Sequence, residues 1–248
     1  MATQLTTRDA STTPHQRALR STVARKALMA VTGLFLVLFL LMHMFGNLKL
    51  LIPDNGAEFD EYSEALRTFL YPVLPEKFFL TCFRGVLAVA ILVHLEAAIR
   101  LTFRDYDAKG GLGRYFKQRF LGGSFAARTM IWGGVIIVLG VIVHLLQFTG
   151  QIIKVNYPAG AASVLPHERV VLGFQEWWLV LLYAIWMLAV CFHVWHGFYS
   201  AFCTLGARVG AASEKVIKFC AWVVAILLYI GFMLTPVLIF LGVIFPNA

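Results

Sequence analysis

The stretch CFHVWHGFYSAFCTLG, residues 191–206, places two histidines in a run of residues too apolar to leave a lipid bilayer. His193 and His196 are three residues apart, so both rings share one face of a helix. A polar ring at that depth needs a partner. Because histidine is neutral near pH 7, it enters hydrocarbon without the cost of an ion, and its bare nitrogen is a good ligand for a transition metal or haem iron. The stretch therefore indicates a membrane helix that holds a redox cofactor.

The composition of the 248-residue chain is that of an integral membrane protein, with 60% hydrophobic residues, 14% charged residues and a mean hydropathy of +0.77. Five apolar runs are long enough to cross a hydrocarbon core, which takes about 20 residues. We expect an all-α fold in which residues 1–26 form a polar segment and residues 27–248 a bundle of five transmembrane helices. The predicted spans are 28–50, 79–103, 126–148, 174–203 and 216–244. Chemistry on a water-soluble substrate is then expected to belong to another polypeptide.

The net charge of +8 is gathered beside particular spans, which argues against a nucleic-acid partner. The positive-inside rule places the N-terminus and the second and fourth links in the cytoplasm, and the C-terminus outside, in the inner (plasma) membrane. The N-terminal stretch has no apolar core of its own, so we do not interpret it as a cleaved signal peptide. The cations concerned are Arg8, Arg17, Arg20, Arg25, Lys26, Arg104, Lys109, Arg114, Lys117, Arg119, Arg128, Arg208, Lys215 and Lys218.

The links and span ends predict several further features. The sequence DEYSEALRTFLYP, residues 60–72, is expected to form a short amphipathic helix on the surface, and His167 in the third link to be solvated. Glu96 and Arg100, four residues apart, are expected to form an ion pair. Arg84, near the outer end of the second span, is expected to snorkel or to bind an anion.

Histidines occur in four of the five spans, and their depths fall into two layers. At about 1.5 Å per residue, His43 and His144 lie about 23–27 Å from the cytoplasmic face, whereas His94, His193 and His196 lie about 11–15 Å from it. Each layer joins histidines from two helices, which a six-coordinate haem requires above and below its ring. A single membrane histidine is more often a polar packing residue, but two depth-matched pairs favour two haems, about 10–15 Å apart. Depth alone leaves both His193 and His196 open as the inner ligand.

The chain resembles a known family, the five-helix, di-haem cytochrome b subunits that anchor succinate:quinone oxidoreductases and fumarate reductases in the membrane. The resemblance covers nearly the whole chain. It rests on R-K-x-x-M-A-V-T-G leading to H-M-F-G-N within residues 25–47, on single histidines in the second and third spans, and on H-V-W-H-G-F-Y-S-A-F-x-T-L-G in residues 193–206.

The resemblance implies two b haems, the outer one held by His43 and His144 and the inner one by His94 and His193. His196 would then bond a propionate or the quinone. The chain departs from the family pattern at Cys203, where many relatives have glutamine. With Cys191, His193 and His196 nearby, this departure leaves open an iron–sulfur centre with mixed ligands in place of the inner haem.

By this resemblance, the chain anchors a flavoprotein and an iron–sulfur subunit on the cytoplasmic face and carries their electrons to a membrane quinone, expected to be menaquinone. Succinate oxidation itself would occur in the partner, so no catalytic residue for succinate is expected here. The complex could also form a homo-oligomer. The residues expected to dock the partner or bind propionates are Arg20, Arg25, Lys26, Arg114, Lys117 and Arg119, and those expected to relay protons near the outer haem are Lys49, Glu61 and Glu64.

Two other functions stay open at this point. A transporter or proton channel lined by histidines would need polar residues repeated along several helix faces, and outside the second span the helices carry few besides histidine. The second is a di-haem cytochrome that serves a different dehydrogenase. Only the family resemblance favours an anchor of succinate:quinone oxidoreductase over this alternative.

Overall fold

The computed structural model describes residues 21–108 and 125–246, together with Thr13. Within this part of the chain every regular element is a helix, and five helices are long and apolar enough to cross a membrane, which confirms the expected all-α membrane fold. They are α2 (Thr22–Leu48), α4 (Phe78–Ala108), α5 (Phe125–His144), α7 (Trp177–Thr204) and α8 (Ala211–Phe240). Which helix ends face the cytoplasm stays a prediction.

Each predicted span overlaps one of these helices, and hydrogen bonds at the helix starts explain where the bounds differ. Helix α2 begins early because the Ser21 hydroxyl accepts a bond from the Ala24 N–H at 3.1 Å. Helix α8 begins at Ala211 because the Ser213 hydroxyl accepts from the N–H groups of Val209 and Gly210, both at 3.0 Å.

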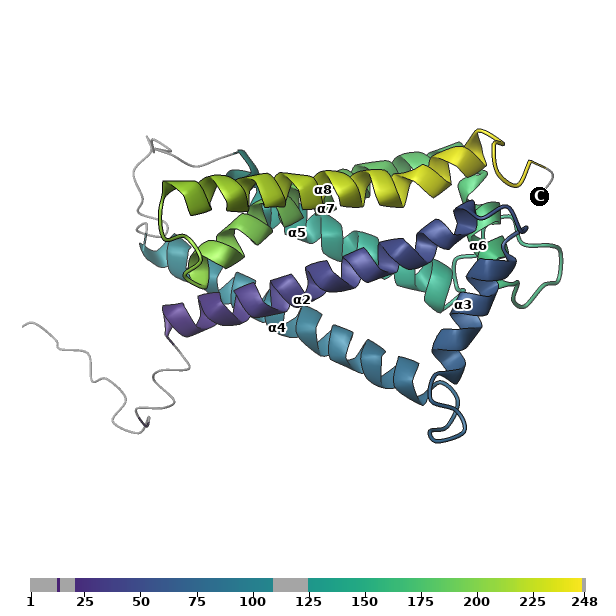
Figure 1. The fold of residues 1–248 in the computed structure, drawn as a ribbon, viewed down its shortest axis with the longest axis horizontal. Helices are drawn as coiled ribbons and strands as arrows, with labels where there is room; N and C mark the ends of the chain where they lie inside the picture. Colours follow the sequence, from purple (N-terminus) through teal and green to yellow (C-terminus); the bar gives the residue numbers. More distant parts are fainter. Residues whose placement is uncertain (1–12, 14–20, 109–124, 247–248) are drawn as a thin grey trace, which may run out of the picture.

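Helix α7 is central to the bundle and packs against α8, α5 and α2, while α4 packs against α2 (Figure 1). The shared core contains Met44 of α2, Val190 of α7 and Leu228 of α8, all buried. A side chain at Gly231 would overlap the Met44 sulfur, so this glycine lets α2 approach α8 closely. The α7 helix, which carries His193, is therefore held on three sides.

One end of the bundle carries two short helices, α3 (Ala57–Thr68) and α6 (Pro166–Phe174), and we call it the α3–α6 end (Figure 1). Helix α3 confirms the predicted surface helix and contacts α2, α4 and α6. Helix α6 was not predicted. Its start has a recognisable signal, because Pro166 fits the first helical position and the Glu168 carboxylate accepts from the Leu165 N–H at 2.7 Å.

The expectation that His167 is solvated is wrong. Its Nδ1 lies 2.6 Å from one carboxylate oxygen of Asp60 in α3, and its backbone N–H donates to the other at 2.9 Å. The ring also stacks on Phe245, with centroids 6.1 Å apart. His167 therefore joins α6 to α3, a long-range contact that no local pattern in the sequence shows.

The charged residues near the span ends are largely paired. Glu96 and Arg100 form the ion pair that their spacing predicts. Lys49 pairs with Glu58 at 2.5 Å, and Glu64 with Arg67 at 3.2 Å, so two of the three residues expected to relay protons form ion pairs. Several residues of the expected docking surface lie outside the described residues, namely Arg20, Arg114, Lys117 and Arg119.

Candidate cofactor sites at two histidine pairs

The outer pair consists of His43 in α2 and His144, the last residue of α5. Their ring centroids are 5.8 Å apart and the rings are nearly perpendicular, at 87°. Aromatic rings surround the pair, with centroids between 5.2 and 5.8 Å from one or other imidazole, and they come from four elements: Phe39, Phe148, Trp186 and Phe232. The surroundings are thus apolar and keep water away from two neutral rings.

Two buried polar side chains, Tyr183 and Gln147, lie beside the outer pair, and Tyr183 contacts His144. The Tyr183 hydroxyl lies 3.1 Å from the Gln147 side-chain oxygen and 3.4 Å from His144 Nδ1. Since the hydroxyl has one proton and donates it to Gln147, it can only accept from His144. The proton of His144 then sits on Nδ1, and Nε2 is left with a free lone pair that can bind a metal.

Gln147 lies in a segment of π-helix, Leu145–Thr149, that continues α5. Such segments are rare and often occur at functional sites. The side chain is 3% exposed, and its Nε2 has no hydrogen-bond partner in the part of the chain that the structure describes. The sequence analysis missed Gln147 and Tyr183, although a lone glutamine within an apolar span is a signal of the same kind as a lone histidine.

The inner pair consists of His94 in α4 and His193 in α7, whose ring centroids are 6.3 Å apart. The Nδ1 of His94 lies 3.2 Å from the carbonyl oxygen of Met29 and 3.2 Å from the Thr32 hydroxyl, which itself donates to the Leu28 carbonyl at 2.8 Å. A carbonyl only accepts, so the proton of His94 sits on Nδ1 and its Nε2 is free. His193 Nδ1 is buried and has no hydrogen-bond partner among the described residues.

A glycine makes the position of His94 possible. A side chain at Gly33 of α2 would place its first carbon 3.1 Å from His94 Cε1, closer than nearly all such contacts. The absence of a side chain at Gly33 therefore lets the His94 ring approach the α2 backbone closely.

The separation of the rings fits a group that takes one nitrogen from each side. Two imidazoles bound to opposite sides of one metal ion, each at about 2 Å, have centroids about 6 Å apart. The two measured separations, 5.8 and 6.3 Å, bracket this value. In the described part of the chain no three His, Cys, Asp or Glu side chains gather as metal ligands, but a haem takes only two protein ligands.

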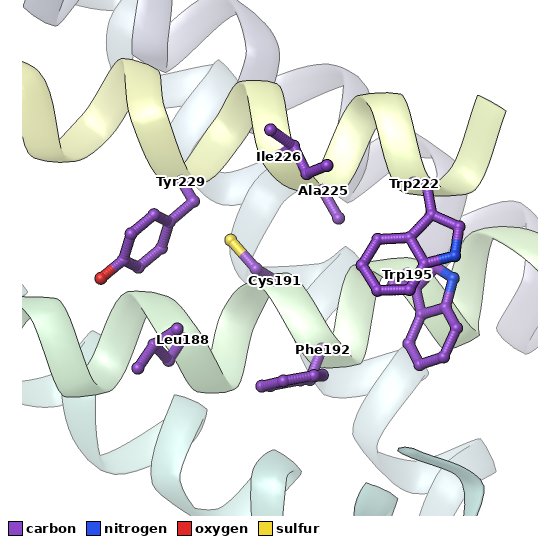
Figure 2. Close-up of a pocket in the computed structure, with 8 residues that line it drawn as sticks. All are labelled: Leu188, Cys191, Phe192, Trp195, Trp222, Ala225, Ile226 and Tyr229. Atoms are coloured by element: carbon purple, nitrogen blue, oxygen red, sulfur yellow. The ribbon is translucent and has the colours of Figure 1, made fainter. Parts of the chain in front are cut away.

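Figure 2 shows where Cys191 points. Its sulfur is directed toward α8, in an apolar groove of about 200 Å³ between α7 and α8 that also contains Trp195, Trp222 and Tyr229. The two indole rings contact each other there, with centroids 4.5 Å apart and planes tilted by 36°. His196 lies one turn beyond His193 and is partly buried, but the ring that neighbours His94 is that of His193. The structure thus shows which of the two histidines lies beside His94, a choice that their similar depths along the helix leave open.

Comparison of the chain with protein-family models, with curated proteins and with solved structures gave no match. Any assignment of function therefore rests on the residues and their geometry.

Proposed function

We propose that the chain is the membrane-anchor cytochrome b subunit of a succinate:quinone oxidoreductase, which passes electrons from soluble flavoprotein and iron–sulfur subunits to a membrane quinone, with menaquinone expected. The observation that carries the proposal is that the four spanning helices with histidines bring them together as two pairs. Each pair has the separation of two axial ligands. The family resemblance of the sequence supplies the identity of the dehydrogenase.

The residues that would hold two b haems are His43 with His144 and His94 with His193. Haem iron, when bound, supplies reversible one-electron transfer at a potential that its axial ligands and their surroundings tune. The chain contributes neutral imidazoles whose Nε2 atoms are free, because Tyr183 fixes the proton of His144 and the Met29 carbonyl that of His94.

The packing of the helices keeps each pair in place. His193 is on α7, which α8, α5 and α2 hold on three sides, and the aromatic rings around the outer pair exclude water. When a bound group gains or loses charge, the protein and water around it reorganise, and this reorganisation is small in a rigid, dry site. These features suit a group that gains and loses single electrons, and they do not suit a water-filled transport path.

A haem is better supported at the inner site than an iron–sulfur centre. Such a centre needs four protein ligands, and the Cys191 sulfur points into the apolar groove toward α8. The basic ends of the helices, including Arg25 and Lys215, support the proposal of a partner docked at the end opposite α3 and α6.

A pyridine haemochrome assay of the purified chain, calibrated against its own peptide absorbance, tests the cofactor. We expect a value near two b haems per polypeptide. A value near zero contradicts the proposal, and a value near one leaves one pair without haem. Co-purification with a succinate-oxidising flavoprotein tests the identity of the complex, and isolation with a dehydrogenase for another substrate contradicts that part of the proposal alone.

A further inference from the structure

A cavity of about 270 Å³ opens at the α3–α6 end, and four cations dominate its polar lining. The cations come from α3, from α4 and the residue before it, and from α6, and three neutral polar residues complete the polar wall. The polar residues are Arg67, Lys77, Thr81, Arg84, Thr149, Gln151 and Arg169. Among the described residues no carboxylate lines this cavity, so the four cations share it without an acidic residue in its wall.

The backbone and the packing hold these cations together. The Lys77 N–H donates to the Arg67 carbonyl at 2.6 Å, which joins the end of α3 to the start of α4. The Arg169 guanidinium donates through Nε to the Val164 carbonyl and through Nη1 to the Phe148 carbonyl, both at 3.1 Å. These bonds fix the Arg169 side chain and leave its other N–H donors for a ligand.

The charges are poorly compensated. Burial lowers the pKa of the Arg169 guanidinium, and the neighbouring charge of Arg67 lowers it further, although Tyr157 and Asp60 act in the opposite direction. Among the described residues, the ion pairs at this cavity are limited to that of Arg67 with Glu64, which is largely exposed. Like charges gathered in a partly buried cavity favour the binding of an anion.

The segment beside the cavity is unusually apolar for a link. Five large apolar side chains between the end of α3 and the start of α4 are exposed, and Val73 is 84% exposed; they are Phe69, Leu70, Tyr71, Val73 and Phe78. Such a cluster is costly in water and stable where it dips into the membrane interface. The mouth of the cavity then lies at the level of the lipid head groups.

We propose that this cavity binds the phosphate head group of an anionic phospholipid. The four cations supply charge and N–H donors for the phosphate, and the apolar segment at residues 69–78 lies against the acyl chains. The cavity adjoins the outer pair, because Phe148 lines it and its ring centroid lies 5.2 Å from that of His144, but the proposal rests on the cations and requires neither the proposed cofactor nor the dehydrogenase partner.

The test uses the whole chain in nanodiscs of phosphatidylcholine with a minor fraction of phosphatidylglycerol, and native mass spectrometry counts the phosphatidylglycerol retained. The variant Lys77→Gln/Arg84→Gln removes two cavity cations. Each cation near a membrane surface strengthens binding about fivefold, so we expect retention to weaken about 30-fold. The matched control Lys154→Gln/Lys215→Gln removes two cations from outside the cavity and should retain the lipid as the parent does.

Three outcomes would overturn the proposal. The first is equal retention by the parent and the cavity variant. The second is that inorganic phosphate raises the unfolding temperature of the parent as much as phosphatidylglycerol does, which would identify a site for the free anion. The third is loss of a haem from the cavity variant with unchanged lipid retention. The variant Arg84→Lys keeps the charge and should keep the lipid, and an unfolding temperature of the glutamine variant equal to that of the parent without added lipid shows that any loss does not come from misfolding.

Discussion

The two histidine pairs are oriented by different kinds of hydrogen bond. In the outer pair, His144 is held by the Tyr183 hydroxyl, a side chain from another helix that is itself fixed by Gln147. In the inner pair, His94 is held by the Met29 carbonyl, a backbone group of the facing helix. A side chain can be deleted by mutation and a carbonyl cannot. The outer pair is therefore the one whose orientation and chemistry substitutions can adjust, whereas the inner pair is fixed by the fold.

The largest expected effect is the loss of one haem, and only one, when either histidine of a pair is replaced. His43→Ala and His144→Ala should each remove the outer haem, and His94→Ala and His193→Ala the inner one, because each iron needs both rings. The haemochrome assay should fall from two haems to one, and reduced-minus-oxidised spectra of the four variants should form two classes. A variant that loses both haems would show that the pairs are not independent sites.

His196 provides the control for the inner pair. Its ring is one turn from His193, but the ring that neighbours His94 is that of His193. We therefore expect His196→Ala to keep both haems, with at most a shift in the inner spectrum. If His196→Ala loses the inner haem and His193→Ala keeps it, the assignment of the inner ligand is wrong.

The next effect concerns the inner pair, where the α2 backbone at Gly33 limits the position of the His94 ring. Gly33→Ala adds a carbon 3.1 Å from His94 Cε1, so the ring must move away from its partner. We expect partial loss of the inner haem and an unchanged outer haem in the same haemochrome and difference spectra. Gly85→Ala is the matched control, because a side chain there meets nothing within 4 Å. Equal haem content in the two variants would show that the inner pair is looser than the contacts indicate.

A smaller effect is expected when the hydrogen bonds that orient His144 and His94 are changed one at a time. Tyr183→Phe removes the acceptor of His144 Nδ1, and loss of such a partner weakens metal binding about tenfold or more. The bond also makes the ligand more basic, so its loss should raise the midpoint potential of the outer haem in a redox titration. Thr32→Val leaves the Met29 carbonyl in place and should change the inner potential less. A larger shift for Thr32→Val would reverse the comparison between the pairs.

Much of this fold could be predicted because the bilayer imposes it. Length and hydropathy alone locate five spans, since a chain in hydrocarbon must close its backbone hydrogen bonds within each helix. Depth along each helix then indicates which histidines share a layer, because the rise per residue is fixed. The five predicted spans, the pairing of His43 with His144 and the pairing of His94 with a histidine of α7 follow from these two regularities.

Features that depend on rotation about a helix axis or on contacts between links could not be predicted. The depths of His193 and His196 are similar, so the choice of His193 comes from the family resemblance and not from depth, and the rotation of α7 against α4 places the His193 ring beside His94. Tyr183 is an ordinary residue of an apolar helix until α5 brings His144 and Gln147 beside it. His167 seemed solvated because its partner, Asp60, is 107 residues away in the sequence.

The smallest expected effect concerns the α3–α6 end, which lies over the outer pair. Asp60→Asn keeps an acceptor for the His167 N–H but removes the negative charge beside its ring, and we expect a loss of about 1 kcal/mol of stability. Glu64→Gln is the control, because its pair with Arg67 is largely exposed and contributes less. Thermal unfolding in detergent, followed at the absorbance of each haem, should show the outer haem released at a lower temperature in Asp60→Asn and the inner haem unchanged. If both haems are released together, the two short helices stabilise the whole bundle rather than the outer site.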